Sequence, residues 1–270
     1  MNVRKSGEDS GKIRKSPAIF QHLFVLGRPA CGKSEFIDFM KKLPADERAA
    51  RFGIGRFEEV DDFPWLWEAC VEDDRREQKG EPRLVSERVP EGYNIVKPKF
   101  RGSLVDRFNA VITTKYLGNP AFYEDGTLLI EFARGAGDGF RESLERFDRR
   151  ILGRAAILYI DVSFEESYRR NNARYKRGLE ESILFHKVPD RDMFGYFRDN
   201  DWQRITGRAT GGGLADLAPG GVIEIAGLGV PFVSMNNEVE SVDHTILAER
   251  YGRALGRLRD LRGGRDSTGR

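Results

Sequence analysis

Residues 22–36, HLFVLGRPACGKSEF, contain a glycine-rich stretch whose spacing is suited to holding phosphate. The stretch from Gly27 to Ser34 matches the pattern G-x-x-x-x-G-K-[ST] at every fixed position. In such a loop, backbone N–H groups surround the phosphates, the lysine reaches the β- and γ-phosphates and the hydroxyl binds Mg²⁺. The pattern predicts these roles for Lys33 and Ser34. We expect the residues between the ends, Arg28, Pro29, Ala30, Cys31 and Gly32, to complete a nucleotide-binding loop with Gly27.

The residues on either side of the loop predict the two elements that must position it. Residues 23–26 are all apolar, which is typical of a buried parallel strand. Apolar residues then recur at helical spacing from 36 to 43, and Pro44 ends the pattern. The glycines therefore join a strand to a helix N-terminus, where backbone N–H groups and the helix dipole favour an anion.

Strand-like and helix-like segments alternate along the rest of the chain. We expect strands at 52–60, 127–132, 155–162, 222–225 and 230–235, a hairpin within 83–97, and helices at 104–116, 140–151, 163–177 and from about 243. This alternation predicts a three-layer α/β/α fold with about five parallel strands. In such sheets, ligands bind beyond the carboxyl ends of the strands.

Composition predicts one large domain with charged ends. The chain has 270 residues, 39% of them apolar, and a net charge of +2. We expect a domain at 17–258 with an insertion at 72–100 and a lid at about 174–213, between disordered basic tails at 1–16 and 259–270. The small net charge argues against a uniformly basic nucleic-acid binder. With two cysteines and no long apolar run, we expect a cytoplasmic protein without a membrane partner.

The loop and several later stretches resemble the P-loop nucleoside and nucleotide kinase superfamily over most of residues 20–258. EVDDF (59–63) is similar to the Asp-Asp-Phe of uridine kinase-like members, which implies that Asp62 takes the proton of the acceptor hydroxyl and binds metal, with Asp61 beside it. EFARG (131–135) is similar to the acid-x-x-Arg of deoxynucleoside kinases. It implies Glu131 as an alternative base or metal ligand and Arg134 as a phosphate clamp.

Two further stretches extend this resemblance. Residues 157–178, ILYIDVSFEESYRRNNARYKRG, resemble the strand and helix that lead into the lid of thymidylate- and adenylate-kinase-like enzymes. They imply that Arg170 and Arg174, which share a helix face, bind phosphate during catalysis, Arg170 also as a nucleotide ligand. VPFVSMNNE (230–238) resembles the loop that flanks the adenine, which implies a contact from Asn236.

We expect an ATP- and Mg²⁺-dependent phosphotransferase acting on a small hydroxyl or phosphate acceptor, such as a nucleoside or nucleotide. Phosphoryl transfer requires positioning and charge neutralisation, and a hydroxyl acceptor adds a requirement for a carboxylate. We also expect Phe63, Trp65 or Trp67 to contact the acceptor. The alternative is a nucleotide-binding regulatory or nucleic-acid-associated P-loop ATPase whose basic tails dock the partner.

Structural roles remain open for the same residues. Asp61 and Asp62 are also suited to cap the helix that Pro64 starts. Glu131 is suited to pair with a buried arginine. Arg170 and Arg174 are equally suited to form a solvated helix face. Phe63, Trp65 and Trp67 are suited to fill the core.

Overall fold

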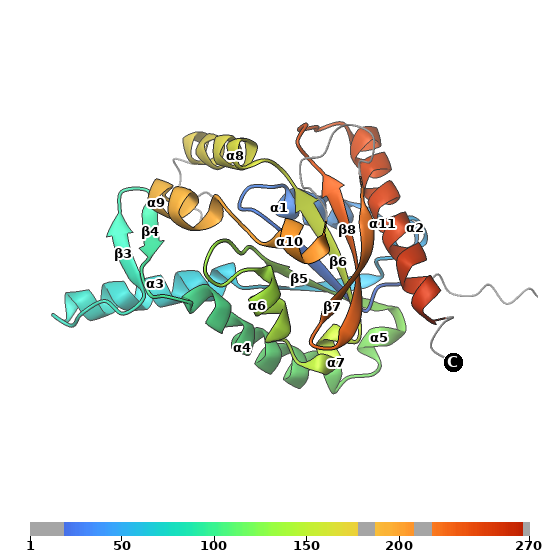
Figure 1. Ribbon diagram of the computed structural model, residues 1–270, viewed down its shortest axis with the longest axis horizontal. Helices are drawn as coiled ribbons and strands as arrows, with labels where there is room; N and C mark the ends of the chain where they lie inside the picture. Colours follow the sequence, from blue (N-terminus) through green and yellow to red (C-terminus); the bar gives the residue numbers. More distant parts are fainter. Residues whose placement is uncertain (1–18, 178–186, 208–217, 267–270) are drawn as a thin grey trace, which may run out of the picture.

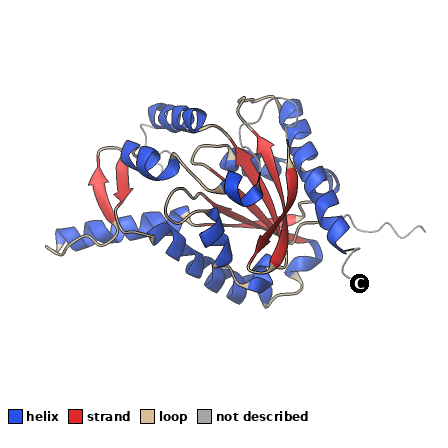
Figure 2. Cartoon of the chain, viewed as in Figure 1, coloured by secondary structure: helices blue, strands red, loops and turns tan. Residues whose placement is uncertain are grey.

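The computed structural model describes residues 19–177, 187–207 and 218–266, and it shows a six-stranded sheet between two layers of helices (Figures 1 and 2). The strand order is β2-β5-β1-β6-β8-β7. Its members are β1 (His22–Gly27), β2 (Arg56–Asp61), β5 (Gly126–Phe132), β6 (Ala155–Asp161), β7 (Gly220–Ile225) and β8 (Leu228–Asn236). The first five strands in this order are parallel, whereas β7 runs antiparallel to β8. The predicted three-layer fold with about five parallel strands is confirmed.

Two apolar cores lie on opposite faces of this sheet. Helices α1 (Lys33–Lys42), α2 (Ala45–Phe52) and α11 (His244–Asp266) cover the face that carries Leu23 and Val25. Helices α4 (Phe100–Ile112), α6 (Phe140–Glu145), α7 (Arg149–Leu152) and α10 (Trp202–Thr206) cover the face that carries Phe24 and Leu26. Because both faces are covered, the central strands β1 and β6 are buried at every position instead of at alternate ones.

An arm made of α3 (Phe63–Gln78), β3 (Ser86–Val89) and β4 (Gly92–Ile95) projects from the domain at the left of Figure 1. Asp73 of α3 is buried and accepts hydrogen bonds from the backbone N–H groups of Leu84, Val85 and Ser86. The hairpin predicted within the 72–100 insertion is confirmed. The helix before it continues to Gln78, because no glycine or second proline interrupts residues 65–78.

The segment predicted as a lid, 174–213, divides into parts with different surroundings. It begins at the end of α8 (Phe164–Arg177) and includes α9 (Asp190–Asp192), the π-helix η3 (Met193–Phe197) and α10; residues 178–186 and 208–213 lie outside the described part. Trp202 of α10 is fully buried, stacks on Tyr159 with ring centroids 4.5 Å apart, and donates its indole N–H to Ser234. Residues near 202 are therefore core, which corrects that part of the prediction.

Two other boundaries differ from those expected. The second strand starts at Arg56 because residues 45–52 form α2. The helix expected over 140–151 is divided, since the Asp148 side chain accepts the N–H of Arg150 and caps a new helix, α7. The remaining elements of the described chain are the π-helix η1 (Thr113–Leu117) and α5 (Phe122–Asp125).

The C-terminal basic segment is helical, not disordered, as far as Asp266. Arg259 donates to the carbonyl oxygens of Ala50 and Arg51 at 3.1 and 3.0 Å, and Arg262 donates to Ile19 at 2.7 Å. These bonds anchor residues beyond 258 to the domain and correct the predicted tail at 259–270 as far as residue 266. The predicted tail at 1–16 lies outside the described residues. Within the described ranges, no helix combines the length and apolarity that a membrane crossing requires.

Candidate active site

The glycine-rich loop connects β1 to α1, as its spacing predicted, and its backbone conformation requires glycine. Gly27, Ala30 and Gly32 have φ angles of 153°, 54° and 109°. A Cβ atom on Gly32 would lie 2.4 Å from Nδ2 of Asn237, and one on Gly27 would lie 2.5 Å from the carbonyl oxygen of Ile160. Because the first N–H groups of a helix lack intrahelical acceptors, the start of α1 is suited to hold an anion.

Lys33 is nearly buried at the start of α1 and directs its ammonium group toward the carboxyl edge of the sheet. Its Nζ donates to the carbonyl oxygen of Arg28 at 3.1 Å and lies 3.8 Å from Oε1 of Glu131. Burial opposes the charge, but Cys31, Glu131 and Asp61 outweigh burial and raise the pKa of Lys33. The ammonium is therefore charged at neutral pH.

Two carboxylates end neighbouring strands next to this ammonium group. Asp61 of β2 is paired in register with Glu131 of β5. Burial, together with repulsion by Glu131 and Asp62, raises the pKa of Asp61 to about 8. Burial likewise raises the pKa of Glu131, against the opposing effect of Lys33. Asp61 accepts the N–H of Phe63 at 3.0 Å, so it also closes the turn before α3.

The structure gives Asp62 and Arg134 a different arrangement from the one predicted. Oδ2 of Asp62 accepts a hydrogen bond from Arg134 at 2.6 Å. The guanidinium of Arg134 is 1% exposed and also donates to Ser143 and to the carbonyl oxygens of Arg101 and Ala133. Arg134 is thus committed to the wall of the site instead of being free to clamp a phosphate. Asp62 is its partner, which leaves Asp61 and Glu131 as the acids nearest Lys33.

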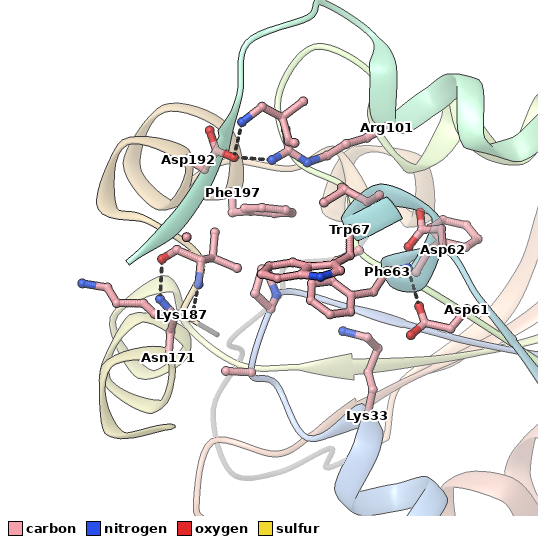
Figure 3. Close-up of a pocket in the computed structure, with 18 of the residues that line it drawn as sticks. Lys33, Asp61, Asp62, Phe63, Trp67, Arg101, Asn171, Lys187, Asp192 and Phe197 are labelled. Carbon is pink, nitrogen blue, oxygen red and sulfur yellow. Dashed lines mark hydrogen bonds and ion pairs between the residues drawn. The ribbon is translucent and has the colours of Figure 1, made fainter. Parts of the chain in front are cut away.

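A cavity of about 210 Å³ opens in front of these residues, and Figure 3 shows its lining. Aromatic rings form much of its wall: Phe63 and Trp67 come from α3, Tyr93 from β4 and Phe197 from η3. In Figure 3 the ring of Phe197 is drawn above that of Trp67, and both rings line the cavity. Trp65 lies outside this wall and packs on Phe108. Of the two roles that the sequence allows for Trp65, the structure therefore gives it the one in the core.

Polar contacts join the described lid residues to the rest of the cavity wall. Arg101 and Asp192 form a buried ion pair, and Asp192 also accepts the N–H of Ile95 at 3.2 Å. Asn171 donates to the carbonyl oxygen of Val188 and accepts its N–H, at 2.8 and 3.0 Å. Sequence reasoning missed Arg101, Asn171 and Asp192, because partners up to 97 residues apart leave no local pattern.

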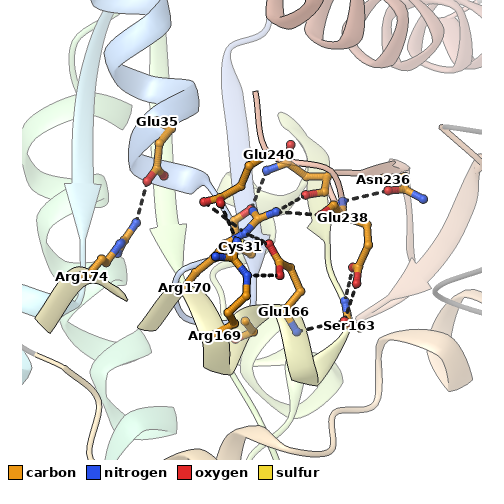
Figure 4. A network of polar contacts seen from close by, with 12 residues as sticks. Cys31, Glu35, Ser163, Glu166, Arg169, Arg170, Arg174, Asn236, Glu238 and Glu240 are labelled. Atoms are coloured by element: carbon orange, nitrogen blue, oxygen red, sulfur yellow. Dashed lines mark hydrogen bonds and ion pairs between the residues drawn. The ribbon is translucent and has the colours of Figure 1, made fainter. Parts of the chain in front are cut away.

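The two arginines predicted to bind phosphate face different surroundings. Arg174 lines the cavity and pairs with Glu35 at 2.9 Å. Arg170 is buried behind the glycine loop and lies outside the cavity lining, as Figure 4 shows. Asn236 accepts the N–H of Glu238, whereas the neighbouring Asn237 donates to the carbonyl oxygen of Cys31. The contact of Asn236 with the nucleotide stays a prediction.

The predicted metal ligands are Ser34, Asp62 and Glu131. Among the described residues, no group of three or more histidine, cysteine or acidic side chains is gathered as a metal site. Ser34 and Glu131 line the cavity together with Asp61. Mg²⁺ bound with a nucleotide needs only one or two carboxylates from the protein, since phosphates and water supply the other ligands. This donor set therefore fits a nucleotide-borne Mg²⁺ better than a resident metal.

Comparisons with known proteins leave the family of the chain open. No protein-family model and no curated protein matches the sequence. One similar solved structure is the Pnkp1/Rnl/Hen1 RNA repair complex, with 14% identity over 61% of this chain and a TM-score of 0.29. This chain spans about two fifths of that one, since the match covers 41% of it.

Two other solved structures match over most of both chains. The protein APE1195 is 12% identical over 90% of this chain and 98% of its own, with a TM-score of 0.39. A sugar kinase from Janibacter sp. HTCC2649 is 14% identical over 87% of this chain and 94% of its own, with a TM-score of 0.35. TM-scores this low decide neither the family nor the activity, which must be argued from the site.

Proposed function

We propose that this chain is a phosphotransferase that uses ATP with Mg²⁺ and phosphorylates a hydroxyl group of a small, uncharged, ring-bearing molecule. The observation that carries the proposal is the convergence of Lys33, Asp61 and Glu131 at one end of the cavity, next to the glycine loop. The loop and α1 would hold the phosphates, and Lys33 would neutralise charge on the oxygens of the moving group.

Asp61 is the residue we assign as the base, in place of Asp62. Within the described chain Asp61 has no ion pair, whereas Asp62 is bound by Arg134. In the reaction, the acceptor oxygen forms a bond to the γ-phosphorus, the bond to the β-γ bridging oxygen breaks, and the hydroxyl proton passes to Asp61. Mg²⁺ bound with the nucleotide would supply positive charge that favours the carboxylate form of Asp61.

The charges around the cavity favour an uncharged acceptor over a phosphate acceptor. All five cationic side chains of the lining have a carboxylate partner: Lys33 with Glu131, Arg101 with Asp192, Arg134 with Asp62, Arg174 with Glu35 and Lys187 with Asp190. An acceptor phosphate would have to compete with these carboxylates and would approach one further acid, Asp61. A neutral hydroxyl avoids that repulsion and uses the acids as proton acceptors.

The aromatic walls favour a flat ring in the acceptor. Trp67 packs against Tyr93 with centroids 5.1 Å apart, which holds one wall in place, and Phe197 adds a further ring to the lining. Offset stacking on such rings adds about 0.5–1.5 kcal/mol beyond the burial of area. Nucleosides combine a flat ring with a neutral hydroxyl and are therefore the first acceptors to try.

The test is ATP consumption by the purified protein with Mg²⁺ and a panel of acceptors. The panel holds nucleosides and other ring-bearing alcohols, nucleotides, open-chain polyols and oligonucleotides with a free hydroxyl end. We expect turnover with a ring-bearing alcohol and none after Lys33→Ala. Turnover confined to nucleotides would refute the acceptor class, and no binding of any nucleotide at millimolar concentration would refute the function.

A further inference from the structure

A buried polar network behind the glycine loop holds two of the loop's carbonyl groups, and Figure 4 shows its part around Cys31 and Arg170. The carbonyl oxygen of Pro29 accepts the hydroxyl of Ser167 at 2.7 Å. The carbonyl oxygen of Cys31 accepts Nδ2 of Asn237 at 2.8 Å and a guanidinium N–H of Arg170 at 3.5 Å. The carbonyl group of Arg28 is held within the loop itself, by Lys33.

Holding a carbonyl group also sets the direction of the next N–H group. A peptide unit is planar and trans, so its C=O and N–H point to opposite sides. With the Pro29 and Cys31 carbonyl groups turned toward Ser167, Arg170 and Asn237, the N–H groups of Ala30 and Gly32 must point away from them. These N–H groups belong to the part of the loop that would surround the phosphates.

The three side chains act on the loop from outside the cavity. Ser167, Arg170 and Asn237 are 0%, 6% and 7% exposed, and none of them lines the cavity. Helix α8 thus has two roles, because its Asn171 and Arg174 do line the cavity. A side chain on the outer face cannot touch a phosphate held by the inner face, so its effect would pass through the peptide units.

The outer side chains are themselves fixed by further contacts. Arg170 donates to the carboxylate of Glu166 at 2.6 Å and to the carbonyl oxygens of Asn237 and Glu238 at 2.7 and 3.0 Å. Oδ1 of Asn237 accepts a hydrogen bond from Arg250 of α11. Residues of α8, α11 and the segment after β8 therefore hold the loop together, which makes its shape independent of a ligand.

We propose that Ser167, Arg170 and Asn237 are positioning residues that fix the peptide planes of the glycine loop, so that its N–H groups face the anion before the anion binds. The proposal rests on the function proposed above. Preorganised donors avoid the entropy cost of ordering the loop during binding. These residues should therefore set the affinity for the phosphates of the nucleotide and leave the KM for the acceptor unchanged.

The sharpest test compares Asn237→Asp with Asn172→Asp. Asn237→Asp keeps the shape and the acceptor for Arg250 but removes the donor to Cys31, whereas Asn172→Asp adds the same charge in α8, where Asn172 donates to the carbonyl oxygen of Tyr168 and lies outside the cavity lining. The measurements are the Kd for ADP with Mg²⁺ by calorimetry and the melting temperature. We expect Asn237→Asp to weaken binding about tenfold, the loss of one well-placed hydrogen bond, and Asn172→Asp to bind like the unmodified protein.

Ser167→Ala and Ser167→Thr give a second test that does not depend on Asn237→Asp folding. We expect Ser167→Ala to weaken ADP binding several-fold and Ser167→Thr, which keeps the hydroxyl, to restore it. Equal affinity in the alanine and threonine variants, or equal loss in both aspartate variants, would overturn the proposal while leaving the phosphotransferase function intact. If the unmodified protein binds no nucleotide, both proposals fall together.

Discussion

The two ends of the candidate site are built in opposite ways. The end proposed to bind the phosphates consists of one continuous stretch of backbone, residues 27–34, with positive φ angles and carbonyl groups held from behind. The end proposed to bind the acceptor consists of side chains from α3, β4, α4, α8 and the segment 187–197, held mainly by ion pairs and ring contacts. Backbone N–H groups suit a phosphate that is the same in every nucleotide, whereas side chains from many segments can be changed to suit one acceptor.

Removal of the lysine at the phosphate end should have the largest effect. Lys33→Ala removes the cation closest to Glu131 and the loop, so we expect phosphoryl transfer to fall about 10³-fold. The rate of ATP consumption with the best acceptor measures the loss. Lys41→Ala, in the same helix but in an exposed pair with Glu59, is the matched control and should keep full activity. Equal activity of the two variants would show that Lys33 and the glycine loop take no part in phosphoryl transfer.

Breaking the buried pair in the wall should mainly cost stability. Asp62→Ala leaves the guanidinium of Arg134 buried without its carboxylate, so we expect the free energy of unfolding to fall by about 3–5 kcal/mol. Urea denaturation at neutral pH measures the change. Exposed Asp106, paired with Arg146, serves as a control, since Asp106→Ala should change stability by less than about 1 kcal/mol. A stable but inactive Asp62→Ala protein would restore Asp62 as the base.

Asp61 should show the opposite combination, with loss of activity and gain of stability. We expect Asp61→Asn to reduce transfer about 10²-fold, since it removes the proton acceptor. The pKa of Asp61 is raised to about 8, so the folded protein keeps a proton that the unfolded chain releases above its ordinary pKa. Stability is therefore lost as pH rises from about 4 to about 8.

Thermal melts across this pH range test the sign of that effect. The asparagine variant lacks the titrating group, so its gain in melting temperature over the unmodified protein should increase from pH 5 to pH 8. A gain that shrinks as pH rises would show that Asp61 is stabilised as a carboxylate, contrary to the assignment.

The smallest expected effect separates two tryptophans of the same helix. Trp67→Ala removes one wall of the cavity, and we expect the KM for the acceptor to rise about tenfold with little change in ADP affinity. Trp65→Ala should instead lower the melting temperature, because Trp65 packs on Phe108 of the core. Acceptor titrations and thermal melts of both variants check this difference. A change of acceptor KM only in the Trp65 variant would mean that the cavity is not the acceptor site.

How much could be predicted from the sequence differs between elements. The strand, loop and helix around residues 22–43 were predictable, because hydrophobic period and glycine spacing are local properties. The end of α11 was not, since the arginines that suggested a solvated tail are held by carbonyl oxygens more than 200 residues away in the chain. The same limitation explains why Arg134 was predicted as a phosphate ligand and is instead the partner of Asp62.

By itself, the sequence determined the fold class, the glycine loop with Lys33 and the presence of acids after the second and third parallel strands along the chain. Only the tertiary structure decided which acid stands free, that Arg170 and Asn237 lie behind the loop, and that Trp67 and Phe197 line one cavity. The physical reason is that backbone conformation follows from neighbouring residues, whereas the partner of a charge or a ring depends on which distant segments pack against it.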